Sequence, residues 1–352
     1  MLKLQYTMKL SSTARTKLND PERIQRRDQW FASLHSMHSI PCGNFTGSVP
    51  RISGVCGNSA DGMLLYSNPE QWLVESLENL AEKTDRYDDE TRFCPWCIQL
   101  DVYSVHFIDR IFGATVFFDH EAKQWYNRYL TTDIGSLEYP DLENSAAWDI
   151  TVRVVKAFID QDVALPLFGL PTIASALNIA VNLYGEDILL KMMTEPELAA
   201  ADLRIINRLL MDIHCYFRGV LPEKQLQPVL PWERAQPPGY GQLCGCTTQL
   251  IGEQLYREQI APLDNDLLGV YPNGGMIHLC GSHSQLIPVF RSMPNLKTVQ
   301  VNDRAAHDLQ RYFTGLRDDQ VIYYMPCEGM PVEKAMELTG GKRLVIQDKV
   351  RF

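Results

Sequence analysis

The chain has 352 residues, of which 45% are hydrophobic and 22% are charged, so it is long enough to bury a sizeable core. Its formal net charge of -10 excludes the broad basic face that a nucleic-acid-binding protein needs. The nine cysteines are scattered, many of them inside apolar runs, and no secretory signal accompanies them. We therefore expect a cytoplasmic protein whose thiols are mostly reduced and buried.

The N-terminal stretch and one uncharged run need separate interpretation. Residues 1–19 contain four basic residues and no acidic one, which is compatible with a transit peptide, but a frayed N-terminal tail over residues 1–25 is the preferred interpretation. No charged residue lies between Asp162 and Glu186. Because prolines and a glycine interrupt this run, it predicts a buried strand, a turn and a packed helix, and not a membrane span.

Hydrophobic periodicity and capping residues predict the elements of the first two thirds of the chain. Helices are expected at residues 20–37, 69–83, 145–159, 172–184 and 195–217, and strands near 40–54, 114–118 and 164–168. Residues 125–133 are expected to be a connector. The proline-rich stretch 222–241 predicts a surface loop that could act as a lid.

After residue 241 strands and helices alternate regularly. Strands are expected at 242–246, 276–280, 296–301, 321–325 and 343–346, and helices at 251–260, 284–291, 305–313 and 331–339. This alternation predicts an α/β fold, and its count favours a single (β/α)8 TIM-type barrel over residues 26–352 with an N-terminal helical extension. The ends of the predicted strands carry Cys246, His278, Cys280, Asn302, Asp303, Cys327, Glu328, Gln347 and Asp348.

Three of these strand-end residues suggest a zinc site. His278 and Cys280 lie two positions apart on one strand, so their side chains share a face, and Cys327 ends another strand. One imidazole and two thiolates are typical of a catalytic zinc with one open position. The alternative is that the three side chains only pack at strand ends. Cys246 could be a fourth ligand, a substrate contact or a core residue, and Cys244 is expected in the core.

The same residues resemble the uroporphyrinogen decarboxylase superfamily, and most closely its methylcobalamin:coenzyme M methyltransferase branch. The resemblance rests on Gly275-Met276-Ile277-His278-Leu279-Cys280-Gly281, on Val301-Asn302-Asp303, on Cys327, and on the upstream runs Phe112-Gly113-Ala114, Gly169-Leu170-Pro171-Thr172, Tyr184-Gly185 and Glu195-Pro196-Glu197. The N-terminal motif of the decarboxylases is absent from residues 41–47, which argues against porphyrinogen decarboxylation.

This resemblance implies a barrel that binds zinc through His278, Cys280 and Cys327. It also implies methyl transfer from methylcobalamin, free or on a corrinoid protein, to a small-molecule thiol such as coenzyme M or homocysteine. The residues expected to contact substrate are Cys246, His283, Asn302, Asp303 and Glu328. Asp303 or Glu328 is expected to accept a hydrogen bond from the second ring nitrogen of His278. No membrane or nucleic-acid partner is expected, and a homodimer is compatible with the sequence.

Three other interpretations remain open from the sequence. The chain could be a metal-free decarboxylase or lyase that binds a small acid through Arg51, or a non-catalytic barrel that binds a corrinoid. Cys94 and Cys97 have the spacing of a redox dithiol, but such a motif should open a helix after a strand, and loop or core cysteines are the preferred interpretation.

Overall fold

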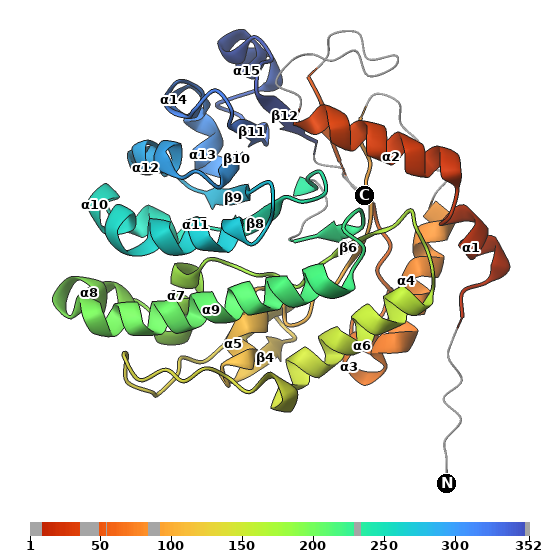
Figure 1. Ribbon diagram of the computed structural model, residues 1–352, viewed down its shortest axis with the longest axis horizontal. Helices are drawn as coiled ribbons and strands as arrows, with labels where there is room; N and C mark the ends of the chain where they lie inside the picture. Colours follow the sequence, from red (N-terminus) through yellow and green to blue (C-terminus); the bar gives the residue numbers. More distant parts are fainter. Residues whose placement is uncertain (1–8, 36–48, 54, 84–91, 229–233, 349–352) are drawn as a thin grey trace.

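A computed structural model describes residues 9–35, 49–53, 55–83, 92–228 and 234–348 (Figure 1). Its strands form two parallel sheets and one antiparallel hairpin. The larger sheet has the order β1 (Arg51–Ile52), β12 (Leu344–Gln347), β11 (Val321–Tyr324), β10 (Leu296–Asn302), β9 (Gly275–Cys280) and β8 (Gly241–Cys244). The smaller has the order β2 (Val55–Cys56), β3 (Trp96–Gln99), β6 (Leu167–Gly169) and β7 (Leu226–Gln227), and β4 (Val116–Asp119) pairs with β5 (Gln124–Asn127).

The helices lie outside the strands. In chain order they are α1 (Ser12–Lys17), α2 (Pro21–Leu34), α3 (Leu64–Ser67), α4 (Pro69–Lys83), α5 (Phe107–Ile111), α6 (Ala146–Asp160), α7 (Ala176–Tyr184), α8 (Asp187–Thr194), α9 (Pro196–Val220), α10 (Glu253–Leu255), α11 (Ala261–Gly269), α12 (Ile287–Ser292), α13 (Asp303–His307), α14 (Leu309–Gly315) and α15 (Val332–Thr339). The mostly parallel sheet and its surrounding helices confirm the predicted α/β class.

Local sequence explains where the predicted helices begin. The Asn68 side chain accepts a hydrogen bond from the Gln71 backbone N–H at 3.2 Å, and Pro69 follows at the first position of α4. Asp20 caps α2 in the same way, with Pro21 next to it. Both helices therefore begin within one residue of the predicted position.

The two parallel sheets are continuous on one side. The Ser53 N–H donates to the Phe93 carbonyl at 2.8 Å, and the Phe93 N–H donates to the Arg51 carbonyl at 2.8 Å. The chain around β1 thus lies between β12 and the segment that leads into β3. The parallel array runs from β8 through β12 and β1 to β7, so its strands curve around a common interior.

Alternate strand residues line this interior. A buried cluster combines Ile52, Cys97, Leu167, Met276, Val321, Tyr323 and Val345, which come from six strands, with Trp30, Phe31 and Leu34 of α2. Because alternate residues of a strand share a face, these side chains lie on the face turned away from the outer helices. Helix α2 therefore covers one open end of the strand array.

The space between β7 and β8 is filled by a short stretch of chain. Among the described residues no ladder joins these two strands. Instead, the Gln236 N–H donates to Gln227 Oε1 at 3.0 Å, and Gln236 Nε2 donates to the Gly241 carbonyl at 2.8 Å. Ala235 is 2% exposed and its carbonyl accepts a hydrogen bond from the Tyr323 hydroxyl. Ala235 and Gln236 are thus buried in the interior, and the prediction of a surface loop is wrong for them.

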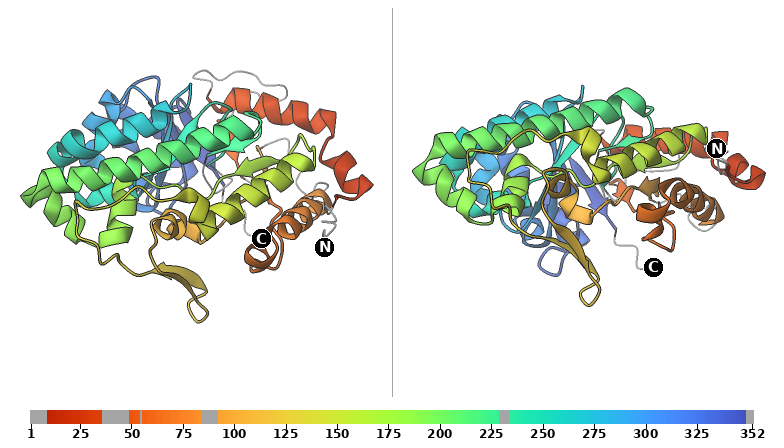
Figure 2. Two further views of the ribbon diagram at one scale, coloured as in Figure 1. Left: turned by 60° about the horizontal axis from the view of Figure 1, so that its bottom comes forward. Right: turned by 90° about the horizontal axis from the view of Figure 1, so that it is seen from below.

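Two further predictions need correction. Leu10, Ala14 and Leu18 belong to the main core, so the described residues 9–20 pack on the domain and do not fray. The expected connector after residue 124 contains β5, which forms a hairpin with β4 that projects from the body (Figure 2). Residues 1–8 and 41–47 lie outside the described residues.

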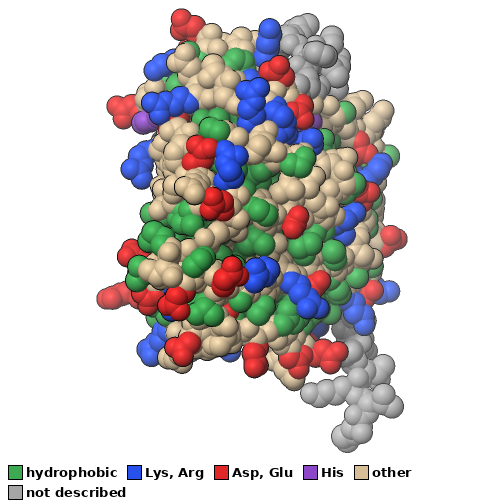
Figure 3. Space-filling model, turned by 60° about the vertical axis from the view of Figure 1, so that its left-hand side comes forward, with side chains coloured by type: hydrophobic (Ala, Val, Ile, Leu, Met, Phe, Trp, Pro, Cys, Tyr) green, Lys and Arg blue, Asp and Glu red, His purple; other side chains and the backbone are tan. Residues whose placement is uncertain are grey.

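The surface view in Figure 3 shows charged side chains of both signs interspersed on one face, with apolar side chains between them. This face carries no continuous basic surface. Among the described helices, none is both long and apolar enough to cross a bilayer.

A close approach between β8 and β9 leads to the first prediction. A Cβ atom at Gly275 would lie 2.2 Å from the Gly241 carbonyl oxygen, which is backbone and cannot rotate away. Replacing Gly275 by Ala should lower the free energy of unfolding by about 1–3 kcal/mol, the usual range for overpacking. Chemical denaturation measures this.

Gly219 in α9 is the matched control, because a Cβ there meets nothing within 4 Å. Gly219→Ala should raise stability by up to about 1 kcal/mol, since alanine is the better helix former. Equal stability of the two variants would contradict the packing at Gly275.

Candidate metal centre

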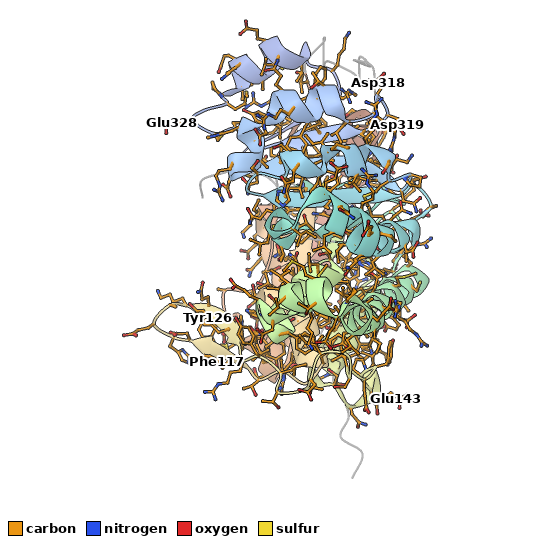
Figure 4. The ribbon with its side chains drawn as sticks, turned by 90° about the vertical axis from the view of Figure 1, so that its left-hand side faces the viewer. Phe117, Tyr126, Glu143, Asp318, Asp319 and Glu328 are labelled. Carbon is orange, nitrogen blue, oxygen red and sulfur yellow. The ribbon has the colours of Figure 1, made fainter. Side chains whose placement is uncertain are left out.

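The predicted site lies at the carboxyl ends of the parallel strands. Asp318 and Asp319 precede β11 and Glu328 follows it, and Figure 4 shows the two aspartates on one side of the molecule and Glu328 on the other. The hairpin residues Phe117 and Tyr126 lie on the same side as Glu328. The strands therefore point toward the side that carries the hairpin.

The centre is built on two neighbouring strands. In the parallel pairing of β8 with β9, Cys244 is the partner of His278, and the Gly245 N–H donates to the His278 carbonyl at 2.9 Å. Cys246 follows two residues after Cys244, and Cys280 two residues after His278. A C-x-C sequence and an H-x-C sequence therefore lie side by side.

Two glycines allow this arrangement. A Cβ at Gly245 would lie 2.6 Å from Ile277 Cδ1, so a larger residue between Cys244 and Cys246 would displace the Ile277 side chain. Gly281 has φ +77°, and a Cβ there would lie 2.2 Å from Gln249 Oε1. Glycine adopts such a φ without strain, so the chain can turn away directly after the strand.

Three donor atoms form one compact group. A sulfur of Cys244, a sulfur of Cys246 and a ring nitrogen of His278 all lie within 4.8 Å of one another. The two sulfurs are 3.4 Å apart, and the Cys280 sulfur lies 3.0 Å from His278 Nε2. The donor set of thiols and one imidazole is the one that zinc prefers.

The imidazole is held in a fixed orientation. Gln300 lies opposite His278 in the pairing of β9 with β10, and its Oε1 accepts a hydrogen bond from His278 Nδ1. Gln300 Nε2 donates to Gln347 Oε1 on β12 at 2.6 Å, which fixes the orientation of the Gln300 amide. All three side chains are buried. His278 Nε2 is therefore directed to the sulfurs with its lone pair available, as in a metal-binding histidine.

The thiols compete for protons. The hydrogen bond from Cys246 to Cys244, a second contact with Cys280 and burial raise the pKa of Cys246. The same hydrogen bond lowers the pKa of Cys244 against the effect of burial, and the nearby Arg234 guanidinium lowers it further. The pKa of Cys280 is also lowered, first by the contact with Cys246. A bound cation would replace these shared protons and keep every sulfur as thiolate.

His283 lies behind the centre and not at its opening. It is fully buried, its Nδ1 is 3.1 Å from the Gly281 carbonyl, and it faces the backbone of Gly245 and Cys246. Burial lowers its pKa, so the neutral form is favoured. Its predicted contact with substrate remains a prediction.

Cys327 lies apart from this group. It follows β11, which β10 separates from β9. Its N–H donates to the Met330 carbonyl at 3.2 Å, and its side chain packs against the main core. Of the three predicted ligands, the structure brings together His278 and Cys280. It adds Cys246, which was one of the open alternatives, and Cys244, which was expected in the core.

The other predicted contacts surround the strand ends. Asn302 is the partner of Cys280 in the β9–β10 pairing, and its side chain accepts from the Asp303 N–H at 2.8 Å, which caps α13. Asp303 and Glu328 are exposed. Neither of them receives the His278 hydrogen bond, because Gln300 does.

The residues of the alternative interpretations have other roles. Arg51 forms a bidentate ion pair with Asp348, with distances of 2.9 and 2.6 Å. Cys97 lies within β3 and Cys94 precedes that strand, where the Cys94 sulfur contacts the Ser53 hydroxyl at 3.2 Å. The pair does not open a helix, so the arrangement that a redox dithiol requires is absent at these two described cysteines.

Comparison with known proteins gives a match among solved structures but none at the level of sequence. No protein-family model matches the sequence, and no curated protein matches it. Among solved structures, a methyltransferase from Methanosarcina mazei matches with a TM-score of 0.60 over 91% of this chain and 91% of that chain, at 11% identity. At this identity the likeness shows the fold alone. It supports the α/β architecture.

The Gln300 hydrogen bond yields a prediction about metal affinity. Gln300→Leu keeps the volume but removes the acceptor for His278 Nδ1, so zinc affinity should fall about 10–100-fold, as is usual when the outer partner of a ligating histidine is lost. Competition with a chromophoric chelator at fixed pH measures the dissociation constant.

Asp303→Asn and Glu328→Gln are the controls, because the sequence favoured these carboxylates for the same role. Both should bind zinc as the unaltered protein does. A weakening in either control equal to that of Gln300→Leu would contradict the proposed orientation of His278.

Proposed function

We propose that this protein is a zinc-dependent methyltransferase that moves a methyl group from methylcobalamin, free or on a corrinoid protein, to a small-molecule thiol. The observation that carries the proposal is the group of Cys244, Cys246 and His278 at the carboxyl ends of two adjacent parallel strands. In parallel α/β folds this end of the strands is where chemistry takes place. The fold is also that of a solved methyltransferase.

The donor set fits zinc and a thiol-activating role. A free thiol has a pKa of about 8.5, so little thiolate is present at neutral pH. When bound, zinc would hold the acceptor sulfur as an oriented thiolate that is ready to attack a methyl group in line. This is the chemistry that a methyl acceptor needs.

The residues of the chain prepare the site for this step. Gln300 and Gln347 hold the His278 ring so that one nitrogen faces the sulfurs. Arg234 lies close enough to influence Cys244 and Cys280 electrostatically, so it offsets part of the negative charge of the thiolates. The buried interior beneath them excludes water, which strengthens these interactions.

We further infer that the strand array closes as a (β/α)8-type barrel. Interior side chains come from strands on both sheets, and residues 234–236 bridge β7 and β8 through Gln227 and Gly241. A closed array would place the metal centre at a single mouth, beside the projecting hairpin.

The proposal predicts both metal content and activity. The purified protein should contain about one zinc per chain, and His278→Ala should lose the metal and lower the rate of methyl transfer from methylcobalamin to thiols at least about tenfold, because a lost ligand costs more than a lost outer partner. Elemental analysis and the absorbance change of cobalamin on demethylation measure the two quantities.

Cys327→Ser is the matched control, and it should keep zinc and activity. A protein without zinc that decarboxylates or cleaves a small acid would support the metal-free alternative. Cobalamin binding without methyl transfer in any condition would support a non-catalytic barrel. Either result would overturn the proposal.

A further inference from the structure

We propose that a second ligand site, which binds a phosphate dianion, lies at the opposite end of the parallel strands from the candidate metal centre. The site is a pocket of about 430 Å³, its opening to solvent included, between α2 and the segment that leads into β3. Arg23, Arg26, Arg27 and Arg92 line it, and none of its described lining residues is acidic. In a chain of formal net charge -10, this concentration of arginines around one pocket makes a local site for an anion.

The pocket is separate from the candidate metal centre. Of its lining residues, 92–96 lead into the start of β3, and Leu165 lies two residues before β6. These are the amino ends of parallel strands, whereas Cys244 and Cys280 are the last residues of β8 and β9. An anion bound here therefore stands apart from the proposed methyl-transfer chemistry.

The sequence of α2 concentrates positive charge on one side of the helix. Arg26, Arg27 and Trp30 follow Arg23 by three, four and seven residues, which is the spacing of one helical face. The arginines lie in the first half of α2, where the helix dipole disfavours cations, and like charges at this spacing repel one another. A bound dianion would relieve this repulsion, so it would stabilise the helix that binds it.

Packing holds two of the guanidinium groups in place. Arg27 is 5% exposed, and its Nη1 donates to the Ala164 and Leu165 carbonyls at 2.7 and 2.9 Å. The Arg23 guanidinium lies 5.3 Å from the centroid of the Trp96 ring, in a cation–π contact. Side chains that are already fixed lose little conformational entropy when a ligand binds.

The carboxylates near these arginines do not prevent binding of a ligand. Asp20 Oδ2 lies 4.0 Å from Arg23 Nε, and Asp348 Oδ2 lies 3.9 Å from Arg92 Nη1. Asp348 also forms the bidentate pair with Arg51. Because a guanidinium has five N–H donors and ion pairs at a protein surface are weak, a dianion can bind beside these carboxylates or compete with them.

Phosphate suits this set of donors better than a carboxylate does. Every cationic side chain that lines the described pocket is an arginine, whose planar fork binds two oxygens at once. A phosphate group offers at least three acceptor oxygens and nearly two negative charges, so it can contact several arginines together. The ligand is therefore free phosphate or the phosphate group of a small metabolite.

Isothermal titration calorimetry with inorganic phosphate, at constant ionic strength, tests the site. The unaltered protein should give a single-site isotherm. Arg23→Gln and Arg92→Gln should each weaken binding about 10–100-fold, as expected when a charged hydrogen-bond donor is lost.

Arg208→Gln is the matched control, because it makes the same change of charge at a side chain of α9 that is 75% exposed. It should bind phosphate as the unaltered protein does. Absence of binding to the unaltered protein, or equal weakening in all three variants, would overturn the proposal.

His278→Ala tests whether phosphate binds at the metal centre instead. Its affinity for phosphate should equal that of the unaltered protein, and treatment with a chelator should change neither. Loss of phosphate binding in His278→Ala would place the anion at the metal centre and overturn the assignment to the arginine-lined pocket.

A measurement on the unaltered protein covers the case in which a variant does not fold. Cys94 lines the pocket, whereas Cys215 is exposed on α9. Saturating phosphate should remove most of the N-ethylmaleimide labelling of Cys94, as followed by mass spectrometry, and leave that of Cys215 unchanged. Labelling of Cys94 that does not respond to phosphate would contradict the site.

A parallel titration with AMP, a phosphate monoester, separates the two sources of the ligand. Tighter binding of AMP than of phosphate, lost in Arg23→Gln and Arg92→Gln, supports a phosphorylated metabolite. Tighter binding of phosphate, lost in the same variants, supports the free ion.

Discussion

The in-register pairing of β8 with β9 is the constraint on which the centre depends. A parallel ladder fixes which residue faces which, so the partnership of Cys244 with His278 also decides where Cys280 lies. Cys246 comes just after β8, at the start of a short 3-10 helix over Cys246–Leu250. A slip of β9 by one residue would turn the side chains of His278 and Cys280 to the opposite face. The contact between Gly275 and the Gly241 backbone holds the two strands close at their start, and Gly245 does so at their end.

The interior of the fold supports this pairing in an unusual way. No ladder joins β7 and β8 among the described residues, and residues 234–236 lie between them. The side chains of Gln227 and Gln236 form hydrogen bonds with backbone groups that would otherwise lack a partner. Glutamines also hold His278, so neutral amides take the part that carboxylates often play beside a metal. A neutral partner leaves the imidazole less basic and adds no charge to a cluster that already contains three sulfurs.

Much of the fold was predictable from sequence because its signals are local. Helix α4 carries its cap at Asn68 and its apolar stripe within one segment, and β9 to β12 alternate with helices at regular spacing. The residues of the site were harder to predict, because they depend on which strands are neighbours in the sheet. Cys327 follows β11, which β10 separates from the strand that carries His278, whereas Cys244 ends the adjacent strand β8. The C-x-C spacing of Cys244 and Cys246 was visible in the sequence, but the order of the strands in the sheet was not.

The hydrogen-bond chain from His278 through Gln300 to Gln347 has a consequence for biosynthesis. Gln347 lies on β12, 47 residues beyond Gln300, so the ring that binds the ion is not locked until the final described strand has taken its place beside β11. In a partly synthesised chain, the side chains of Cys244, Cys246, His278 and Cys280 would not yet be held in fixed orientations. Metal loading with the right geometry should therefore follow completion of the sheet, which ties correct metallation to a fully assembled domain.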